Sequence, residues 1–207
     1  MALFCDATLL VARHGDADYP HEGGILSDHG GWLTPTGREQ VTALVERVRD
    51  RRIARVFTSE LDRARESAEL AASLLDVPVV ALRGLEEYSV GTLAGRAWED
   101  RPLQPIQDAW SAGDLARRIP GGESGADIIE RYTGALQAIA DQHRGETTLV
   151  ISHGGVMSFV LPRVSGNVRD DLADKRFLAN CAAAELLVGD DGWRVVHWPG
   201  VADDDAV

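Results

Sequence analysis

Basic side chains and histidines follow directly after three of the most apolar runs in the chain. Arg13 and His14 end the run "TLLVARH", Arg63 follows "ARVFTSELD", and His153 and Gly154 end "TTLVISHG". The carboxyl ends of parallel strands meet at one edge of a sheet, so we expect these residues to share a crevice there. Guanidinium groups and helix N-terminal amides bind phosphoryl groups, and the crevice is therefore predicted to bind a phosphate.

His14 is the candidate nucleophile, because a neutral imidazole can attack phosphorus. A backbone carbonyl that accepts the other ring N–H would fix the required tautomer. Arg13 and Arg63 would disfavour the imidazolium form and stabilise the equatorial phosphate oxygens in the transition state. His153 would donate to the same oxygens.

An acid is also needed, to protonate the leaving alkoxide and later to take a proton from water. Its best source is "RGLEEYSVGTLAGR", in which Glu86 and Glu87 precede a loop kept open by Gly91 and Gly95. A carboxyl beside a bound phosphate dianion has a raised pKa, as a general acid requires near neutral pH. At this point either glutamate fits the role.

The elements that must position these residues alternate along the chain: apolar, β-rich runs are followed by helical patterns, which predicts parallel β-α-β units and an α/β fold. Strands are expected at residues 8–13, 54–59, 78–82 and 147–152, with two more in "AAAELLV" and "WRVVHW". Helices are expected in "TPTGREQVTALVERVRDR", "SELDRARESAELAASLL" and "ESGADIIERYTGALQAIADQH". Thr34 or Thr36 is the expected cap of the first helix, and Ser59 or Ser67 that of the second.

Two long segments interrupt the alternation. Residues 16–33 and 98–120 are rich in Gly, Pro, Asp and Trp, and long loops in compact domains often serve as lids. We expect one domain over residues 1–207, since a chain of this length with 44% apolar residues can bury one core. Residues 201–207 have little to bury and are expected to fray.

Composition limits the partners and the compartment. A net charge of −12 argues against binding to nucleic acid. The first residues lack a basic region and a cleavage site, and no run of about 18 apolar residues occurs, so neither a secretory signal nor a membrane span is predicted. Cys5 and Cys181 form no CxxC pair and are expected to be buried free thiols, which favours a cytoplasmic protein.

Taken in order, these motifs resemble the histidine phosphatase superfamily, the phosphoglycerate-mutase-like proteins, over nearly the whole chain. The family's R-H-G motif matches residues 13–15, its S-x-L-x-R-A block matches "SELDRA", and "PGGES" and "SHGGVM" are further family-like blocks. The resemblance implies a three-layer α/β/α sandwich with a mostly parallel central sheet. It also implies that Arg63, not Arg65, binds phosphate, and that Glu87, which fits E-x-x-x-G-x-x-x-G, is the acid.

The resemblance implies an activity as well. The expected enzyme is a metal-independent phosphomonoesterase that hydrolyses a small phosphorylated metabolite through a phosphohistidine on His14, with no metal or organic cofactor. The resemblance is also compatible with a homodimer. The expected phosphate-binding groups are Arg13, Arg63, His153 and Gly154. The candidates for the substrate pocket are Asp16, Tyr19, Trp32, Arg117 and Arg118.

The chain departs from the family pattern after the R-H-G motif. The family often continues with E-T-x-x-N, whereas Asp16, Ala17 and Pro20 stand at the matching positions, which puts the first-loop part of the phosphate site in question. The segment "HEGGILSDHGGW" looks specific to this protein. We expect it to shape the substrate pocket.

Three other functions compete with hydrolysis. A metallophosphoesterase would need metal ligands, and the chain offers His14, Asp16, Asp18, His21, Asp28 and His29, although two arginines would repel a dication. A phosphoglycerate mutase would return the phosphoryl group to a second hydroxyl, but true mutases carry a longer insertion where this chain has residues 98–120. A non-catalytic protein that binds a phosphorylated ligand would have lost catalytic residues, and none is missing here.

The remaining charged and aromatic side chains have plainer interpretations. Solvated helix-face charges are expected at Arg38, Glu39, Arg65 and Arg131, and Glu86 is expected on the loop surface. Trp32, Trp98 and Trp110 either clamp a substrate or pack against the core.

Overall fold

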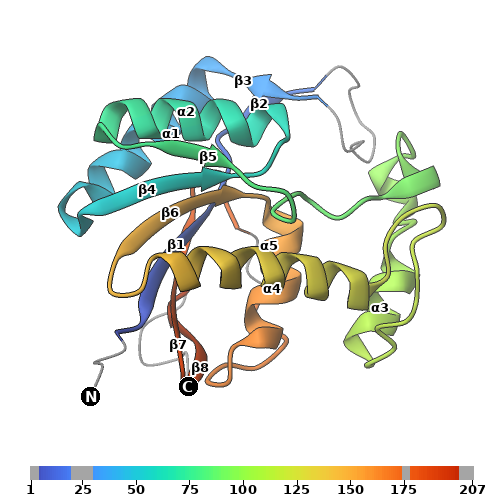
Figure 1. The fold of residues 1–207 in the computed structure, drawn as a ribbon. Coiled ribbons are helices and arrows are strands. Elements are labelled where there is room, and N and C mark those ends of the chain that lie inside the picture. Colours follow the sequence, from blue (N-terminus) through green and yellow to red (C-terminus); the bar gives the residue numbers. More distant parts are fainter. Residues whose placement is uncertain (1–4, 20–29, 174–177, 201–207) are drawn as a thin grey trace.

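The computed structural model describes residues 5–19, 30–173 and 178–200. The sequence-based expectations for residues 20–29 and 201–207 lie outside these described residues. Within them, helices cover both faces of one central sheet, which is the predicted three-layer α/β/α arrangement (Figure 1).

The sheet has six strands in the order β5-β4-β6-β1-β7-β8. They are β1 (Ala7–Arg13), β4 (Ile53–Thr58), β5 (Val79–Ala81), β6 (Thr147–Ser152), β7 (Ala183–Gly189) and β8 (Gly192–His197). Strands β5, β4, β6 and β1 run parallel, and β7 and β8 add an antiparallel edge. Only Asp190 and Asp191 separate β7 from β8, which is a connection too short for a parallel crossover. The prediction of a mostly parallel sheet is confirmed.

Strands β1 and β6 form the middle of the sheet and end at the same level. Their register places Arg13 opposite Ser152. Side chains of β1 are buried on both faces, with Leu9 and Val11 in one apolar cluster and Leu10 in the other. Because both strands are fixed from two sides, the residues that follow them are held on a rigid base.

One face of the sheet is covered by α1 (Pro35–Val48) and α2 (Asp62–Leu75). Thr34, one of the two predicted caps, begins α1, and its hydroxyl accepts the Gly37 N–H at 2.9 Å. The prediction of a serine cap for α2 is wrong: its N-cap residue, Leu61, offers no side-chain acceptor. Ser59 and Ser67 make hydrogen bonds within the candidate site instead.

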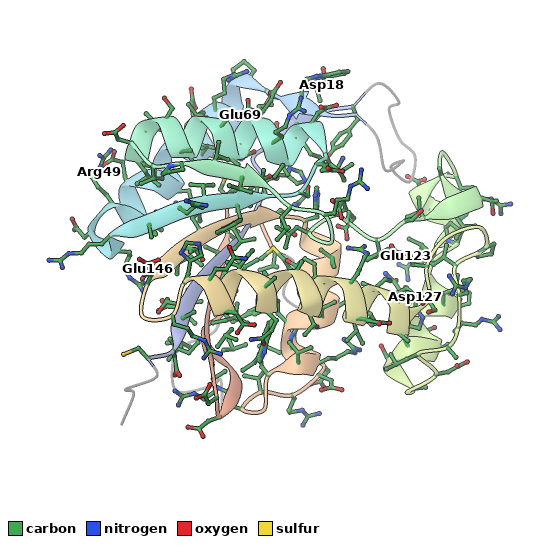
Figure 2. All side chains as sticks on the ribbon, in the orientation of Figure 1. Asp18, Arg49, Glu69, Glu123, Asp127 and Glu146 are labelled. Carbon is green, nitrogen blue, oxygen red and sulfur yellow. The ribbon has the colours of Figure 1, made fainter. Side chains whose placement is uncertain are left out.

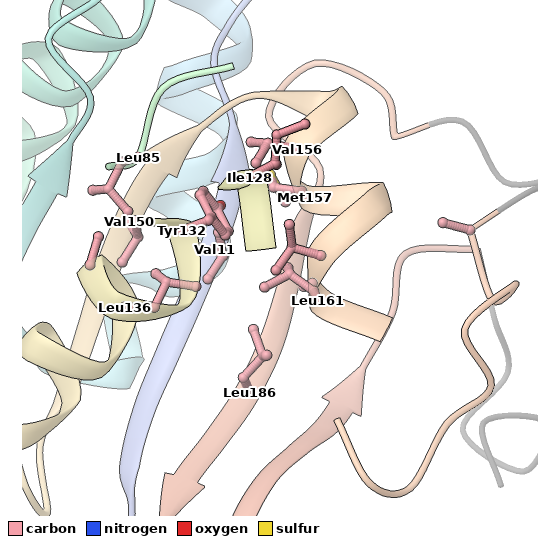
Figure 3. Packing of buried hydrophobic residues seen from close by; sticks show 14 of the residues in the cluster. Val11, Leu85, Ile128, Tyr132, Leu136, Val150, Val156, Met157, Leu161 and Leu186 are labelled. Carbon is pink, nitrogen blue, oxygen red and sulfur yellow. The ribbon is translucent and has the colours of Figure 1, made fainter. Parts of the chain in front are cut away.

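The other face is covered by α4 (Gly125–Gln142) and α5 (Gly154–Val164), with α3 (Gln104–Ser111) beside them. Ser124 and Asp127 form a capping box that begins α4. Figure 3 shows how Tyr132 of α4 and Met157 of α5 pack over Val11 and neighbouring apolar residues. Short 3-10 turns occupy Arg49–Arg51, Gly91–Leu93 and Trp98–Asp100.

Helix α3 lies inside residues 98–120, where the sequence pattern predicted only a loop. Its apolar residues Ile106 and Trp110, together with Leu103, are buried against the core. The indole N–H of Trp110 donates to the Arg117 carbonyl at 2.7 Å. Trp110 is therefore a core residue, and of its two interpretations the substrate clamp is the wrong one.

The described ends of the segment 16–33 are held together by a small second sheet. Strands β2 (Ala17–Asp18) and β3 (Trp32–Leu33) pair in antiparallel fashion. Cys181 is buried as predicted, whereas the prediction that Cys5 is buried is wrong: Cys5 is exposed and precedes the first strand. In the described part of the chain, none of the helices has the length and apolar character needed to span a bilayer.

Candidate active site

The two predicted histidines lie side by side at the carboxyl ends of β1 and β6. The His14 backbone N–H donates to the Ser152 carbonyl at 2.9 Å, which continues the strand pairing by one residue. The His14 and His153 ring centroids are 5.3 Å apart, and both side chains are buried. The sheet thus provides a rigid base for both imidazoles.

The ring of His14 is held in one tautomer. Its Nδ1 lies 2.7 Å from the Gly15 carbonyl oxygen, and since a carbonyl only accepts, Nδ1 carries the hydrogen. Nε2 therefore keeps its lone pair. Burial lowers the pKa of His14 to about 3, and the charges of Arg63 and Arg13 act in the same direction, against the bond to Gly15. The imidazole is neutral at pH 7, as nucleophilic attack requires.

Arg13 and Arg63 bring two guanidinium groups close enough to influence His14. One Nη atom of Arg13 donates to the Leu178 carbonyl at 2.8 Å, and one Nη atom of Arg63 donates to the Gly30 carbonyl at 3.0 Å. Each arginine also acts electrostatically on the other, and burial lowers the pKa of Arg13. Two positive charges held beside a neutral imidazole have the chemistry needed to bind an anion.

His153 is neutral, and one of its ring nitrogens has no hydrogen-bond partner among the residues that the structure describes. Its Nε2 lies 2.7 Å from the Ser59 hydroxyl oxygen. Its Nδ1 is buried and makes no hydrogen bond to the described residues. Burial, followed by the charge of Arg63, holds the pKa of His153 well below its usual value. In the tautomer in which Nε2 accepts the Ser59 hydroxyl, Nδ1 carries the hydrogen and is able to donate to a ligand in the crevice.

The carboxyl group of Glu87 is held by main-chain amides at the beginning of α5. Its two oxygens accept the N–H groups of Gly155 at 2.8 Å and Val156 at 2.6 Å, and one of them also accepts that of Tyr88 at 3.1 Å. Burial raises the pKa of Glu87, while the three amides oppose that change. Because Gly155 follows His153 by two residues, Glu87 lies at the same strand ends as the histidines.

This arrangement agrees with what sequence comparison finds. A family model described as histidine phosphatase superfamily (branch 1) matches residues 9–199. The chain belongs to the histidine phosphatase superfamily.

Two Arabidopsis thaliana relatives in this superfamily are each 30% identical to the chain. They are "Phosphoglycerate mutase-like protein 4", with 95% of this chain and 86% of the relative covered, and "Metal-independent phosphoserine phosphatase", with 94% and 82% covered. The structure of Bacillus stearothermophilus YhfR superposes with a TM-score of 0.80 at 24% identity, over 95% of this chain and 98% of that one. The superfamily relatives thus include proteins named for both mutase and phosphatase activity.

Further residues tie the histidine phosphatase motifs together and were not predicted from the sequence. The Ser67 hydroxyl accepts the Gly15 N–H at 3.0 Å and donates to the Arg63 carbonyl at 2.7 Å. It links the turn that carries His14 to the helix that carries Arg63. Ser59 and Ser67 both lie in the block "SELDRARES". Their place in this motif was the available signal, but the two serines were interpreted only as candidate helix caps.

Arg131 is the clearest correction to the sequence-based interpretation. It was expected on a solvated helix face, but its side chain is largely buried and donates to Glu123 and to three backbone carbonyls of residues 84–87. A helical period cannot show this, because the loop that covers this face of α4 comes from a distant part of the chain. Arg65, in contrast, is exposed and pairs with Asp62 and Glu69, which agrees with its prediction. Glu86 is half-buried and accepts the Gly84 N–H at 2.7 Å, so it is not a simple surface residue.

The structure brings only some of the predicted substrate-pocket residues to the histidines. The Tyr19 ring lies against Arg63, with 5.7 Å between guanidinium carbon and ring centroid. The Asp16 carboxylate accepts the Thr34 hydroxyl at 2.7 Å and so supports the beginning of α1. Trp32 is 54% exposed on β3.

Arg117 and Arg118 lie on a separate surface beside α3. They line an open depression of about 530 Å³ together with Ile106, Asp114, Ala116 and Pro120. Arg118 pairs with Asp127 at 2.6 Å and donates to the Gly122 carbonyl. Neither arginine makes a described contact with the two histidines.

The described residues contain no group of three or more His, Cys, Asp or Glu side chains placed to hold a metal ion. The metal ligands considered from the sequence at His21, Asp28 and His29 lie outside the part of the chain that the structure describes. Of the other candidates, His14 binds the Gly15 carbonyl through Nδ1, and the Asp16 carboxylate accepts the Thr34 hydroxyl.

Proposed function

We propose that this histidine phosphatase is a metal-independent phosphomonoesterase that acts on a small phosphorylated metabolite through a phosphohistidine on His14. The observation that carries the proposal is the state of His14: buried, neutral, with Nδ1 bound to the Gly15 carbonyl and Nε2 left as the nucleophile. Two arginines and a second neutral histidine next to it supply the groups that a phosphoryl transfer requires.

In the first step, His14 Nε2 forms a bond to phosphorus as the bond from phosphorus to the ester oxygen breaks. The guanidinium groups of Arg13 and Arg63, the Nδ1–H of His153 and the Gly154 amide stabilise the equatorial oxygens. Glu87, protonated, donates its proton to the leaving alkoxide, which departs as an alcohol. The raised pKa of Glu87 supports this role, and a bound phosphate dianion would raise it further.

In the second step, Glu87, now a carboxylate, takes a proton from water as that water attacks the phosphohistidine. The bond from phosphorus to His14 breaks, inorganic phosphate leaves, and Glu87 is again protonated. The net reaction is ester plus water to alcohol plus phosphate, so the enzyme returns to its starting state with no cofactor consumed.

Hydrolysis is favoured over a mutase reaction by the segment between β5 and α4. Residues 98–120 form one short turn, the eight-residue helix α3 and a loop, part of which is anchored in the core by Trp110. The longer basic insertion implied for true mutases is absent from the sequence there. A mutase also has to retain the alcohol product and to exclude water until the phosphohistidine has transferred its phosphoryl group to the second hydroxyl.

The test is release of inorganic phosphate from a panel of phosphomonoesters in the presence of a chelator, with wild type and His14→Ala compared. We expect turnover by the wild type and a loss of at least about 10³-fold in the variant, since removing a nucleophile leaves only residual catalysis. Turnover that survives His14→Ala would overturn the mechanism. Phosphoryl exchange between hydroxyls without phosphate release would favour a mutase, and binding without either reaction would favour a phospho-ligand-binding protein.

A further inference from the structure

Arg131 of α4 uses every N–H group of its guanidinium. Nε donates to one oxygen of Glu123 at 2.5 Å and one Nη to the other at 3.0 Å. The remaining donors reach backbone carbonyls: Gly84 at 3.0 Å, Glu86 at 2.9 Å and Glu87 at 3.2 Å. A guanidinium has five N–H donors, and here five acceptors surround it.

Glu123 extends this contact to the other end of the same loop. The oxygen that accepts from the Arg131 Nη also accepts the Ser89 N–H at 2.8 Å. Glu123 lies beside the first turn of α4, next to Asp127 (Figure 2). Arg131 and Glu123 together therefore bind the main chain of residues 84–89 through three carbonyls and one amide.

The loop bound in this way is the one that presents Glu87. The backbone carbonyl of Glu87 accepts a hydrogen bond from Arg131, while its carboxyl group accepts the amides at the beginning of α5. The backbone also approaches α4 closely: a side chain on Gly84, whose φ is +100°, would come within 3.0 Å of the Arg131 carbonyl oxygen. An ion pair that served only the stability of α4 would not need these main-chain acceptors.

We infer that Arg131, with Glu123, is a positioning residue that holds the Glu87 carboxyl group where it transfers protons to and from the substrate. This inference rests on the proposed function, in which Glu87 is the acid and then the base. A lysine at position 131 would keep the charge but offer three N–H donors for five acceptors, so part of the loop would lose its partners. The carboxyl group would then lie farther from the leaving oxygen, or in more than one place.

The dependence of kcat/KM on the leaving group distinguishes a positioning role from a merely structural one. The phenolate of an acidic phenol leaves its phosphate ester without help from an acid, whereas the alkoxide of a simple alcohol has to be protonated as it leaves. We expect Glu87→Gln to lower kcat/KM strongly for alkyl phosphates and little for p-nitrophenyl phosphate. Arg131→Lys is expected to follow the same trend, with about a tenfold loss on alkyl phosphates and less than about threefold on the aryl ester.

Two controls sharpen this experiment. Arg65→Lys changes an exposed arginine that also pairs with two carboxylates, and it is expected to leave both ester classes unchanged. In a Glu87→Gln background, Arg131→Lys is expected to cost nothing more on alkyl phosphates, because the group it positions is already gone. An equal loss on all esters, or full additivity with Glu87→Gln, would overturn the inference.

A second measurement does not depend on catalysis. We expect Arg131→Lys, and likewise Glu123→Gln, to speed hydrogen exchange of the Tyr88, Gly155 and Val156 amides by more than any loss of global stability accounts for, since these amides bind the Glu87 carboxyl group. Unchanged exchange at these three amides would overturn the inference. If the wild type hydrolyses no ester, the proposed function fails, and the exchange data still decide whether Arg131 holds Glu87.

Discussion

At the scale of single residues, the site depends on keeping two histidines uncharged. His14 and His153 are both buried, and Arg13 and Arg63 add positive charge next to them. In water an imidazole is protonated in part at neutral pH, and the protonated fraction cannot attack phosphorus. In the proposed mechanism, the fold thus provides a neutral nucleophile by excluding solvent from it, and the two arginines proposed to bind phosphate help to keep it neutral.

This arrangement makes stability depend on pH in a defined direction. The pKa of His14 is about 3 in the folded protein and about 6.5 when unfolded, so below pH 6.5 the unfolded state binds the extra proton. Stability from neutral His14 is present above about pH 6.5 and is lost as pH falls toward 3. At pH 5 the expected loss is about 2 kcal/mol.

The measurement is urea unfolding at pH 7.5 and pH 5 for wild type and His14→Asn. The free energy of unfolding should fall more steeply with acid in the wild type, because asparagine does not titrate. Equal pH dependence in the two proteins would show that His14 is not held neutral by the fold.

At the scale of elements, the first turn of α5 is central, since its amides bind the Glu87 carboxyl group and it follows His153 directly. Gly155 has to be small. A Cβ there would lie 2.7 and 2.8 Å from the two carboxyl oxygens of Glu87. Contacts this short require either the carboxyl group or the helix to move.

Gly155→Ala is therefore expected to lower kcat/KM for alkyl phosphates by about tenfold or more by displacing Glu87. The matched control is Gly134→Ala in α4, an exposed helical glycine with open space around its Cβ position. That variant should keep full activity and gain about 0.5–1 kcal/mol in stability, because alanine favours helix. Phosphate-release assays and thermal unfolding measure the two effects; full activity in Gly155→Ala would contradict this view of α5.

Element prediction from the sequence succeeded where burial follows a simple period. The runs for β1 and β6 and the stripe of α1 were predicted because their apolar residues repeat at strand or helix spacing. Helix α5 was not predicted: it begins with two glycines, contains Pro162 and has few polar residues, so it lacks an amphipathic pattern. Helix α3 is short and lies in a segment with three prolines, and packing of Trp110 against the core stabilises it more than its own propensity does.

Within the site, the sequence provided the residues of the motifs and left their supports unseen. His14, Arg63, Glu87 and His153 could be proposed because each follows a predicted strand or stands in a motif. The role of Arg131 could not, since its backbone partners lie more than forty positions away in the loop after β5. Hydrogen bonds between a side chain and a distant backbone segment produce no periodic pattern of residue types in the sequence.

At the scale of the whole molecule, one sheet separates two apolar clusters, and strand β1 contributes to both of them. We propose that the chain is a single domain, because neither cluster is complete without the sheet. Thermal unfolding is then expected as one transition, with the calorimetric enthalpy equal to the van't Hoff enthalpy. Two separate transitions would contradict a single cooperative unit.

The net charge of −12 adds a second property of the whole molecule. An anionic ester approaches an acidic protein, and Arg13 and Arg63 at the strand ends provide local attraction. Their burial protects this attraction from screening by salt. Under the proposed function, we therefore expect the site to select its substrate at short range, through direct contact with the phosphoryl group.

The most direct test of the central claim is to mix wild-type protein with a phosphomonoester labelled in its phosphoryl group and to quench rapidly in alkali, where phosphohistidine survives. The account predicts a labelled protein whose phosphate is lost in acid, mapped by mass spectrometry to His14 and absent from His14→Ala. Phosphate on another residue, or release of phosphate by a protein that never becomes labelled under single-turnover conditions, would contradict it.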